Sequence, residues 1–300
     1  MRLVLLTGAT GFVGRSVART LVEGGTAIRC LVRKTANLSP LGGLNLEFAY
    51  GDVTNPESLA AATAGVDTVV HLVAVIREKG DYTFRAVNFL GTSNLVEAAQ
   101  KNGVKSFLHM SVIGATSDPR YPYLYSKWLG EQEVINSGIP YTVFRSSLIF
   151  GEDDVFFNQL AQMVRLYPVV GVVGSGAVRF QPIHVGDVAH CLTQAVADPA
   201  LRGRTVYLGG PEHLTYEGIV DIIIDTHKVA RWKVHVPLSF VRPAVSAMET
   251  FLPNPPVTSV ELGMISIDNI NEPDAVQKVF GFRPVSFREA AGYLVPRKGR

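Results

Sequence analysis

The sequence predicts an α/β protein, with a doubly wound parallel sheet followed by a smaller C-terminal α/β lobe. Short apolar runs alternate with segments of helical periodicity through the first half of the chain. Glycine, proline and polar residues mark the junctions between them. The chain also opens with a strand, a glycine-rich turn and a helix, in that order. We therefore expect a sheet domain over residues 1–150, completed by about 178–200, and the smaller lobe over residues 151–300.

The composition argues against several classes of protein. The 300 residues are 47% hydrophobic and 18% charged, which is wrong for a disordered chain, and a net charge of +2 gives no electrostatic case for nucleic acid. Cys30 and Cys191 are far apart, and we expect buried, reduced thiols rather than a metal site. No signal peptide or long apolar run is visible. We expect a protein that is not secreted and is either cytoplasmic or peripheral on the cytoplasmic face of a membrane.

The stretch from Leu3 to Gly25 predicts a phosphate-binding turn. Leu3–Leu6 is an apolar run that suits a buried strand, and a helix follows the turn until Gly24 and Gly25 end it. Glycines let backbone approach a pyrophosphate closely, and the helix N-terminus faces the anion. A glycine turn with no ligand is the alternative. The residues expected to bind a dinucleotide here are Gly8, Thr10, Gly11, Phe12, Val13 and Gly14.

The second predicted strand, Ala27–Val32, ends in two cations rather than an acid. An acid at this place would accept hydrogen bonds from a ribose 2′-hydroxyl. Arg33 and Lys34 instead favour a 2′-phosphate, so we predict NADP(H) in preference to NAD(H). A pair of solvated surface charges is the alternative interpretation.

The remaining strands and helices continue the alternation. Asp52 follows the third strand, where its carboxylate can accept the adenine amino group and can also cap the local turn. His71 lies in a buried strand, and we interpret it as structural rather than catalytic. The elements expected after the third strand are a strand at Val66–Ile76, a helix at about 82–101, a strand at Ser106–Ser111, a helix at Tyr123–Ser137 and a strand at Tyr141–Arg145.

A series of motifs lies in register over residues 1 to about 190. They are TGATGFVG, GDVTNPESL, VVHLVA, VNFLGTSNLVEAA, YLYSK, FRSSLIFG and QPIHVGDVA. In this order they resemble the extended short-chain dehydrogenase/reductases, which implies a Rossmann-type fold and a bound NAD(P). The resemblance also implies that the cofactor contacts Val53, Leu72, Val73, Ala74, Ser146 and Leu148.

The motif YLYSK contains residues that the resemblance implies are catalytic. Tyr123 and Lys127 are four residues apart, so a helix places both on one face. An ammonium beside a phenol lowers its pKa and lets it exchange a proton with a carbonyl oxygen, and Lys127 can also hold the nicotinamide ribose. Asn88 matches the asparagine that orders a water in this superfamily. The alternatives are a surface Tyr and Lys, and an Asn bonded to backbone.

Two positions depart from the pattern of the superfamily. Ser111 ends the fifth strand, but Val112 aligns with the usual catalytic hydroxyl, so Ser111 either substitutes for it or merely caps the strand. Phe180 stands where nucleotide-sugar epimerases often carry an arginine, and Arg179 is one residue away. Because a one-residue slip on a strand reverses the side chain's face, this disfavours a nucleotide-sugar substrate.

The second half of the chain narrows the resemblance. The segments FGEDDVFFNQLAQMVRLYP, VRFQPIHVGDVAHC, GRTVYLGGPEHLTY and LPNPPVTSVELGMISIDN resemble the NADPH-binding accessory subunits of respiratory complex I and their bacterial relatives among atypical members of the superfamily. Such relatives keep a nucleotide but are often considered structural or regulatory. The apolar segment Leu238–Leu252 is either a lid or core helix, or a surface for a partner or membrane.

Functions from different classes follow from these features. The first is an NADP(H)-dependent oxidoreductase that reduces an apolar carbonyl or alkene. The second is a non-catalytic, NADPH-occupied subunit or assembly factor of a membrane electron-transfer complex, with which the chain would associate peripherally. A nucleotide-sugar epimerase or dehydratase is third. The apolar side chains expected to line the substrate cleft are Val75, Ile76, Val112, Ile113, Phe150, Phe156 and Phe157.

Overall fold

The computed structural model describes residues 2–296, which form two compact units. The first unit runs from the N-terminus to Ser146 and includes Val185–Leu208. The second consists of Ser147–His184 and the chain from Gly209 onward. Each unit has its own hydrophobic core. The chain therefore leaves the first unit after a strand, returns to it for a helix and a strand, and leaves again.

The first unit is built on a seven-stranded sheet in which every paired strand is parallel. The strand order is β11-β6-β5-β4-β1-β2-β3, so the direction of winding reverses between β1 and β4. This confirms the predicted doubly wound, Rossmann-like sheet. The strands are β1 (Leu3–Thr7), β2 (Ala27–Val32), β3 (Glu47–Tyr50), β4 (Thr68–His71), β5 (Ser106–Val112), β6 (Tyr141–Ser146) and β11 (Arg204–Leu208).

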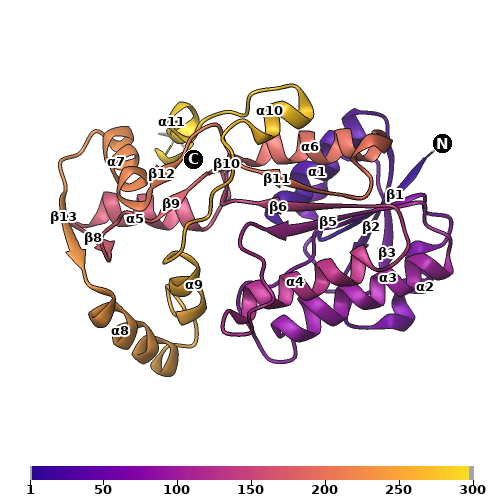
Figure 1. Cartoon of the computed structure of the whole chain (residues 1–300), viewed down its shortest axis with the longest axis horizontal. Helices are drawn as coiled ribbons and strands as arrows, with labels where there is room; N and C mark the ends of the chain where they lie inside the picture. The colour runs from indigo at the N-terminus through magenta and orange to yellow at the C-terminus, as the bar shows by residue number, and fades with distance from the viewer. Residues whose placement is uncertain (1, 297–300) are drawn as a thin grey trace. The chain divides into compact units, whose positions relative to one another are not determined.

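Helices cover both faces of this sheet (Figure 1). Helices α1 and α6 pack together on one face, while α2, α3 and α4 lie on the other. The bounds are α1 (Phe12–Glu23), α2 (Leu59–Thr63), α3 (Gly91–Lys101), α4 (Pro122–Ile135) and α6 (Val185–Ala197), with short 3₁₀ turns η1 (Ser39–Leu41), η2 (Pro56–Ser58) and η4 (Pro199–Leu201).

The core between the sheet and α2, α3 and α4 explains the apolar runs of the sequence. Leu5, Val69 and Phe107 come from three neighbouring strands and are fully buried. Leu95 of α3 packs against them. Burying a side chain of this size contributes roughly 1.5–3 kcal/mol. Because helices cover both faces of the sheet, its parallel strands carry apolar side chains on both faces.

One predicted helix divides into two kinds of helix. The sequence suggests a continuous helix over about 82–101, but Phe84–Leu90 forms a π-helical segment, η3, and α3 begins only at Gly91. The hydroxyl of Thr83 caps the segment by accepting from the Ala86 amide at 3.0 Å. π-Helical turns are rare and often occur at functional sites. The segment contains Asn88, one of the predicted site residues.

The second unit is smaller and has an aromatic core. Its largest buried side chains include Phe150, Phe157, Phe180 and Phe287. Three two-stranded sheets, β7–β10, β9–β12 and β8–β13, accompany its helices. The elements are β7 (Ile149–Phe150), α5 (Phe156–Leu166), β8 (Val169–Val173), β9 (Arg179–Phe180), β10 (Ile183–His184), β12 (Leu214–Thr215), α7 (Tyr216–His227), β13 (Trp232–Val236), α8 (Leu238–Phe251), α9 (Ser259–Met264), α10 (Ala275–Phe280), α11 (Phe287–Ala290) and η5 (Ala291–Leu294).

Helix α8 coincides with the apolar segment noted in the sequence. Of its residues, Val245 is buried, whereas Phe240 and Phe251 are 70% and 81% exposed. Between residues 2 and 296, no helix combines the length and apolar character needed to cross a bilayer. The same residues contain no cluster of His, Cys, Asp and Glu suited to a metal ion. Cys30 and Cys191 are buried free thiols, as predicted, and burial raises the pKa of both.

Candidate functional site

The turn after β1 has the geometry that its glycines require. Gly8 has φ of +75°, and a Cβ there would lie 3.1 Å from the carbonyl carbon of Leu72. At Gly14 a Cβ would lie 2.0 Å from the carbonyl oxygen of Gly8. The amide of Gly11 donates to that same oxygen at 3.0 Å. The turn is therefore closed on itself and packed against the end of β4, and side chains at Gly8 or Gly14 would force it apart.

The N-terminus of α1 emerges from this turn without a side chain that would neutralise it. Gly11 is the N-cap residue and supplies no side-chain hydrogen bond, and the first turn contains no acid. The unpaired amides and the helix dipole therefore leave a positive site for an anion. Thr10, Phe12 and Val13 are partly exposed around it. The turn lies at the end of β1, beside β4, where the winding of the sheet reverses and such sheets bind ligands.

The next two strand ends form a polar rim at the same edge of the sheet. Arg33 and Lys34 follow β2 and are exposed. Asp52, after β3, accepts from the Thr54 amide at 2.9 Å and from its hydroxyl at 2.8 Å. The predicted turn-capping role of Asp52 is thus confirmed. Its interaction with adenine stays a prediction.

Tyr82 is a neighbour of this rim that the sequence analysis missed. Its hydroxyl donates to Oδ2 of Asp52 at 3.0 Å, and the Arg33 guanidinium carbon lies 5.3 Å from the centre of its ring. The sequence assigned position 82 to a helix, and nothing local to it indicated a contact with β2 or β3. A Gly-Asp pair just before it, typical of a tight turn, was the available signal.

Helix α4 presents the two residues of the YLYSK motif to the protein interior. Tyr123 is 6% exposed, its ring packs edge-on against Phe84 at 5.7 Å, and burial raises the pKa of its phenol. Lys127 is 2% exposed and donates from Nζ to the Met110 carbonyl oxygen at 2.7 Å. Burial lowers the pKa of Lys127 to about 8, although the charge of Glu131 acts in the opposite direction. The expectation that Lys127 lowers the phenol pKa was therefore wrong for this structure, in which burial raises the pKa of Tyr123.

Asn88 connects three parts of the first unit. Its amide nitrogen donates to the Val75 carbonyl and to the Ser126 hydroxyl, both at 3.0 Å. Its amide oxygen accepts from the Val75 backbone at 2.8 Å. The residue thus ties η3 to the segment after β4 and to α4. These contacts match the alternative of an Asn bonded to backbone, and a water held by Asn88 stays a prediction.

Ser111 and Val112 end β5 in different environments. Ser111 is fully buried, and among residues 2–296 its hydroxyl has no hydrogen-bond partner. Val112 is half-buried, and it pairs with Ser146, which is buried at the end of β6. The catalytic role of Ser111 stays a prediction. Of the other expected cofactor contacts, Leu72, Val73 and Ala74 follow β4, Val53 follows Asp52 and packs under Gly91, and Leu148 belongs to the second unit.

His71 ends β4 in a fully paired, neutral state. Its Nδ1 lies 2.7 Å from the Thr7 hydroxyl, and its Nε2 lies 3.1 Å from the Thr92 hydroxyl. Because the Thr92 hydroxyl donates its proton to the Asn88 carbonyl at 2.8 Å, Nε2 must be the donor to Thr92. Burial lowers the pKa of His71 to about 3. These contacts support its interpretation as structural.

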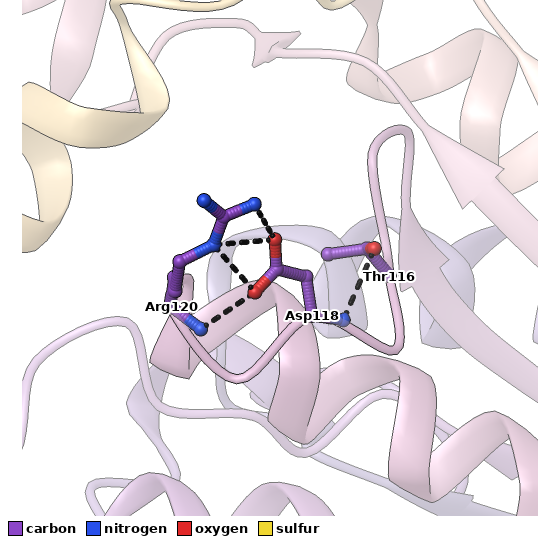
Figure 2. Close-up of polar contacts among 3 residues, drawn as sticks. All are labelled: Thr116, Asp118 and Arg120. Atoms are coloured by element: carbon purple, nitrogen blue, oxygen red, sulfur yellow. Dashed lines mark hydrogen bonds and ion pairs between the residues drawn. The ribbon is translucent and has the colours of Figure 1, made fainter.

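The loop between β5 and α4 is held by a polar cluster (Figure 2). Arg120 Nε lies 3.0 and 2.9 Å from the two Asp118 carboxylate oxygens, and the Arg120 amide donates to one of them at 3.0 Å. The Asp118 amide donates to the Thr116 hydroxyl at 3.3 Å, and the Tyr121 amide donates to the Asp118 carbonyl at 3.2 Å. The cluster therefore shapes the entry into α4, immediately before Tyr123.

With this geometry in place, comparison with known proteins gives the family. The profile of the NAD dependent epimerase/dehydratase family matches residues 4–209. The chain belongs to this family. The match covers the sheet, the glycine turn and α4, and it confirms the resemblance to the extended short-chain dehydrogenase/reductases. A dinucleotide of the NAD(P) class is the cofactor expected of the family.

Curated relatives of this family member include subunits of respiratory complex I. The chain is 27% identical over 278 residues to "NADH dehydrogenase [ubiquinone] 1 alpha subcomplex subunit 9, mitochondrial" of Arabidopsis thaliana, with 88% of this chain and 67% of that protein covered. The Mus musculus protein of that name is 30% identical, with 74% and 60% covered. An NAD(P)H azoreductase of Xenophilus azovorans is 28% identical, with 71% and 70% covered. The chain thus spans about two thirds of the length of these relatives.

Solved structures share the fold over almost the whole chain. The crystal structure of gox2253 has a TM-score of 0.79 at 27% identity and covers 98% of this chain and 97% of its own. A Thermus thermophilus UDP-glucose 4-epimerase complex with NAD has a TM-score of 0.75 at 20% identity, with 97% of each chain covered. At that identity the second comparison shows the fold alone.

Proposed function

We propose that the protein is an NADP(H)-dependent oxidoreductase that reduces an apolar carbonyl or alkene. The observation that carries the proposal is the placement of Tyr123 and Lys127. Both are buried on α4. The Lys127 amine donates a hydrogen bond to the Met110 carbonyl near the carboxyl end of β5, at the sheet edge that also carries the glycine turn. A lysine buried without a carboxylate bonded to its Nζ is costly for stability, and such placement is typical of functional sites.

The residues of the first unit fit a dinucleotide. The glycine turn has no side chain where a pyrophosphate would lie, and the α1 N-terminus supplies unpaired amides. Arg33 and Lys34 favour a 2′-phosphate at the end of β2, and Lys127 would hold the nicotinamide ribose. When bound, NADPH supplies a hydride. We assign cofactor binding to the first unit and substrate or partner binding to the second.

The chemistry required of the chain is a proton transfer. Reduction of a carbonyl adds a hydride to carbon and a proton to oxygen, and Tyr123 donates that proton. Its raised pKa keeps the phenol protonated at neutral pH, as a proton donor requires. Lys127 is mostly cationic below about pH 8 and stabilises the phenolate that remains. Asn88 holds a water through which the Tyr123 phenolate regains its proton, and Ser111 orients the substrate oxygen.

Two measurements test the proposal in order. Calorimetry of the whole chain with NADPH and NADH should show tighter NADPH binding by roughly tenfold or more, because charge-assisted contacts favour the phosphate. A screen of hydrophobic ketones, enals and quinones should then reveal NADPH oxidation. Equal affinities would contradict the NADP(H) assignment, and firm NADPH binding without turnover of any compound would contradict the reductase assignment.

A second candidate is a non-catalytic, NADPH-occupied subunit or assembly factor of a membrane electron-transfer complex, associated peripherally with the membrane. This candidate is favoured by Val112, which stands where the superfamily usually carries a catalytic hydroxyl. It is also favoured by the exposed apolar residues of α8 and by the similarity to proteins named as NADH dehydrogenase subunits. Co-purification of such a complex with native protein would support it. The nucleotide-sugar alternative is disfavoured because Phe180 is buried and because Arg179 Nε donates a hydrogen bond to Asp268 Oδ2 at 2.9 Å.

A further inference from the structure

We propose that Tyr82 is a positioning residue that holds Arg33 ready for the 2′-phosphate and so sets the preference for NADP(H). The inference rests on the proposed NADP(H)-binding function and adds a residue that the family pattern does not supply. It begins from three groups brought together at the ends of β2 and β3. These are the guanidinium of Arg33, the ring of Tyr82 and the carboxylate of Asp52.

The first step is that Tyr82 itself is held in place. Lys79 and Tyr82 exchange backbone hydrogen bonds of 3.2 and 3.1 Å across a two-residue turn. Gly80 occupies the first position of that turn with φ of +57°, which favours glycine. The Tyr82 hydroxyl is bonded to Asp52 at 3.0 Å. Backbone and hydroxyl therefore fix the ring from both ends.

The second step is that Arg33 depends on this ring. Arg33 is exposed, and it forms no ion pair with any residue between 2 and 296. Its guanidinium lies 5.3 Å from the centre of the Tyr82 ring, within the range of a cation–π contact. An arginine has several rotatable bonds, and ordering it on binding costs affinity. A guanidinium already resting on an aromatic face has lost part of that freedom beforehand.

The third step concerns the acid beside the cation. A carboxylate close to a phosphate site can pair with the arginine that the phosphate needs. Both oxygens of Asp52 are occupied instead, one by Thr54 and the other by Tyr82. Tyr82 thus stacks on Arg33 with its ring and binds Asp52 with its hydroxyl. This arrangement leaves the donors of Arg33 available to a phosphate.

The test is a set of calorimetric titrations on the whole chain. NADPH, NADH, 2′,5′-ADP and 5′-AMP are the probes. Tyr82→Leu should weaken NADPH and 2′,5′-ADP by about three- to tenfold more than it weakens NADH and 5′-AMP. Tyr82→Phe keeps the ring and should lose less. Because Tyr82 acts through Arg33, the double variant Arg33→Ala/Tyr82→Leu should bind NADPH as Arg33→Ala does.

A matched control uses another cation–π pair, in which the arginine is exposed and the aromatic ring is half-buried. The Arg85 guanidinium carbon lies 5.6 Å from the Phe89 ring centre, and Phe89→Leu should leave the NADPH to NADH ratio unchanged. Equal weakening of NADPH and NADH by Tyr82→Leu, or a further loss in the Arg33→Ala background, would overturn the inference alone. Failure of the parent chain to bind either dinucleotide would instead overturn the proposed function.

Discussion

The Arg145 guanidinium donates two hydrogen bonds to the Glu131 carboxylate, of 2.9 Å from Nε and 2.6 Å from Nη2. Glu131 is 1% exposed on α4, one turn beyond Lys127, and Arg145 lies on β6. The pair therefore fixes α4 against the sheet at the depth where Tyr123 and Lys127 are buried. Two-pronged contacts of this kind constrain geometry as well as energy.

Removing the cation should leave a buried carboxylate without its partner. We expect Arg145→Met to lower the free energy of unfolding by about 3 kcal/mol, measured by urea denaturation at neutral pH. Arg120→Met breaks an exposed ion pair with Asp118 and should lower the free energy of unfolding far less than Arg145→Met does. The double variant Arg145→Met/Glu131→Gln should recover part of the loss. Equal effects of the two single arginine variants would show that the burial of Glu131 does not matter.

The lowered pKa of Lys127 predicts a pH-dependent cost to stability. Its folded pKa of about 8 lies below its ordinary 10.5, so between these values the unfolded chain binds more protons and stability rises with pH. The cost is fully present below about pH 8. The advantage of Lys127→Met over the parent should shrink by about 1 kcal/mol between pH 7 and pH 9.

Comparing variant with parent at each pH cancels the titration of other groups, including the buried cysteines. Lys101→Met serves as the control, because Lys101 is exposed and paired with Glu97. Its stability relative to the parent should not change over this range. A constant difference for Lys127→Met would mean that the buried amine keeps its ordinary pKa.

The sequence predicted those parts of the molecule that depend on local pattern. Apolar runs such as Leu3–Leu6, followed at once by a glycine-rich turn, are typical of buried strands, and the spacing of glycines in that turn has few other structural solutions. The π-helical segment Phe84–Leu90 was missed, because its seven residues make fewer than two turns, which is too short for the apolar pattern to separate a π-helix from an α-helix. The contacts of Arg145 and Tyr82 were missed because their partners are distant in sequence and depend on how strands and loops meet.

Gly11 should be needed for the nucleotide rather than for the fold. Its φ of −77° suits any residue, and a Cβ would lie 3.2 Å from the Gly8 carbonyl oxygen, so we expect the turn to form after a shift of a few tenths of an ångström. Gly11→Val would place a branched side chain at the helix N-terminus, where we propose that the pyrophosphate binds. We expect calorimetry to show NADPH binding weakened at least about a hundredfold, with a melting temperature within a few degrees of the parent. Gly24→Val, at the other end of α1, should bind NADPH normally.

Tyr123 should be needed for turnover and not for the cofactor. Tyr123→Phe removes the phenol hydroxyl but keeps the ring that packs on Phe84, so the fold should be preserved. With a substrate from the NADPH oxidation screen, we expect kcat to fall about a hundredfold or more while NADPH affinity changes less than about twofold. Tyr125→Phe is the control, since Tyr125 lies on the same helix and stacks on Trp128 instead. Lys127→Ala should weaken both turnover and NADPH binding, because we propose that its amine stabilises the Tyr123 phenolate and also binds the nicotinamide ribose. Turnover by Tyr123→Phe at the rate of the parent would exclude this phenol as the proton donor.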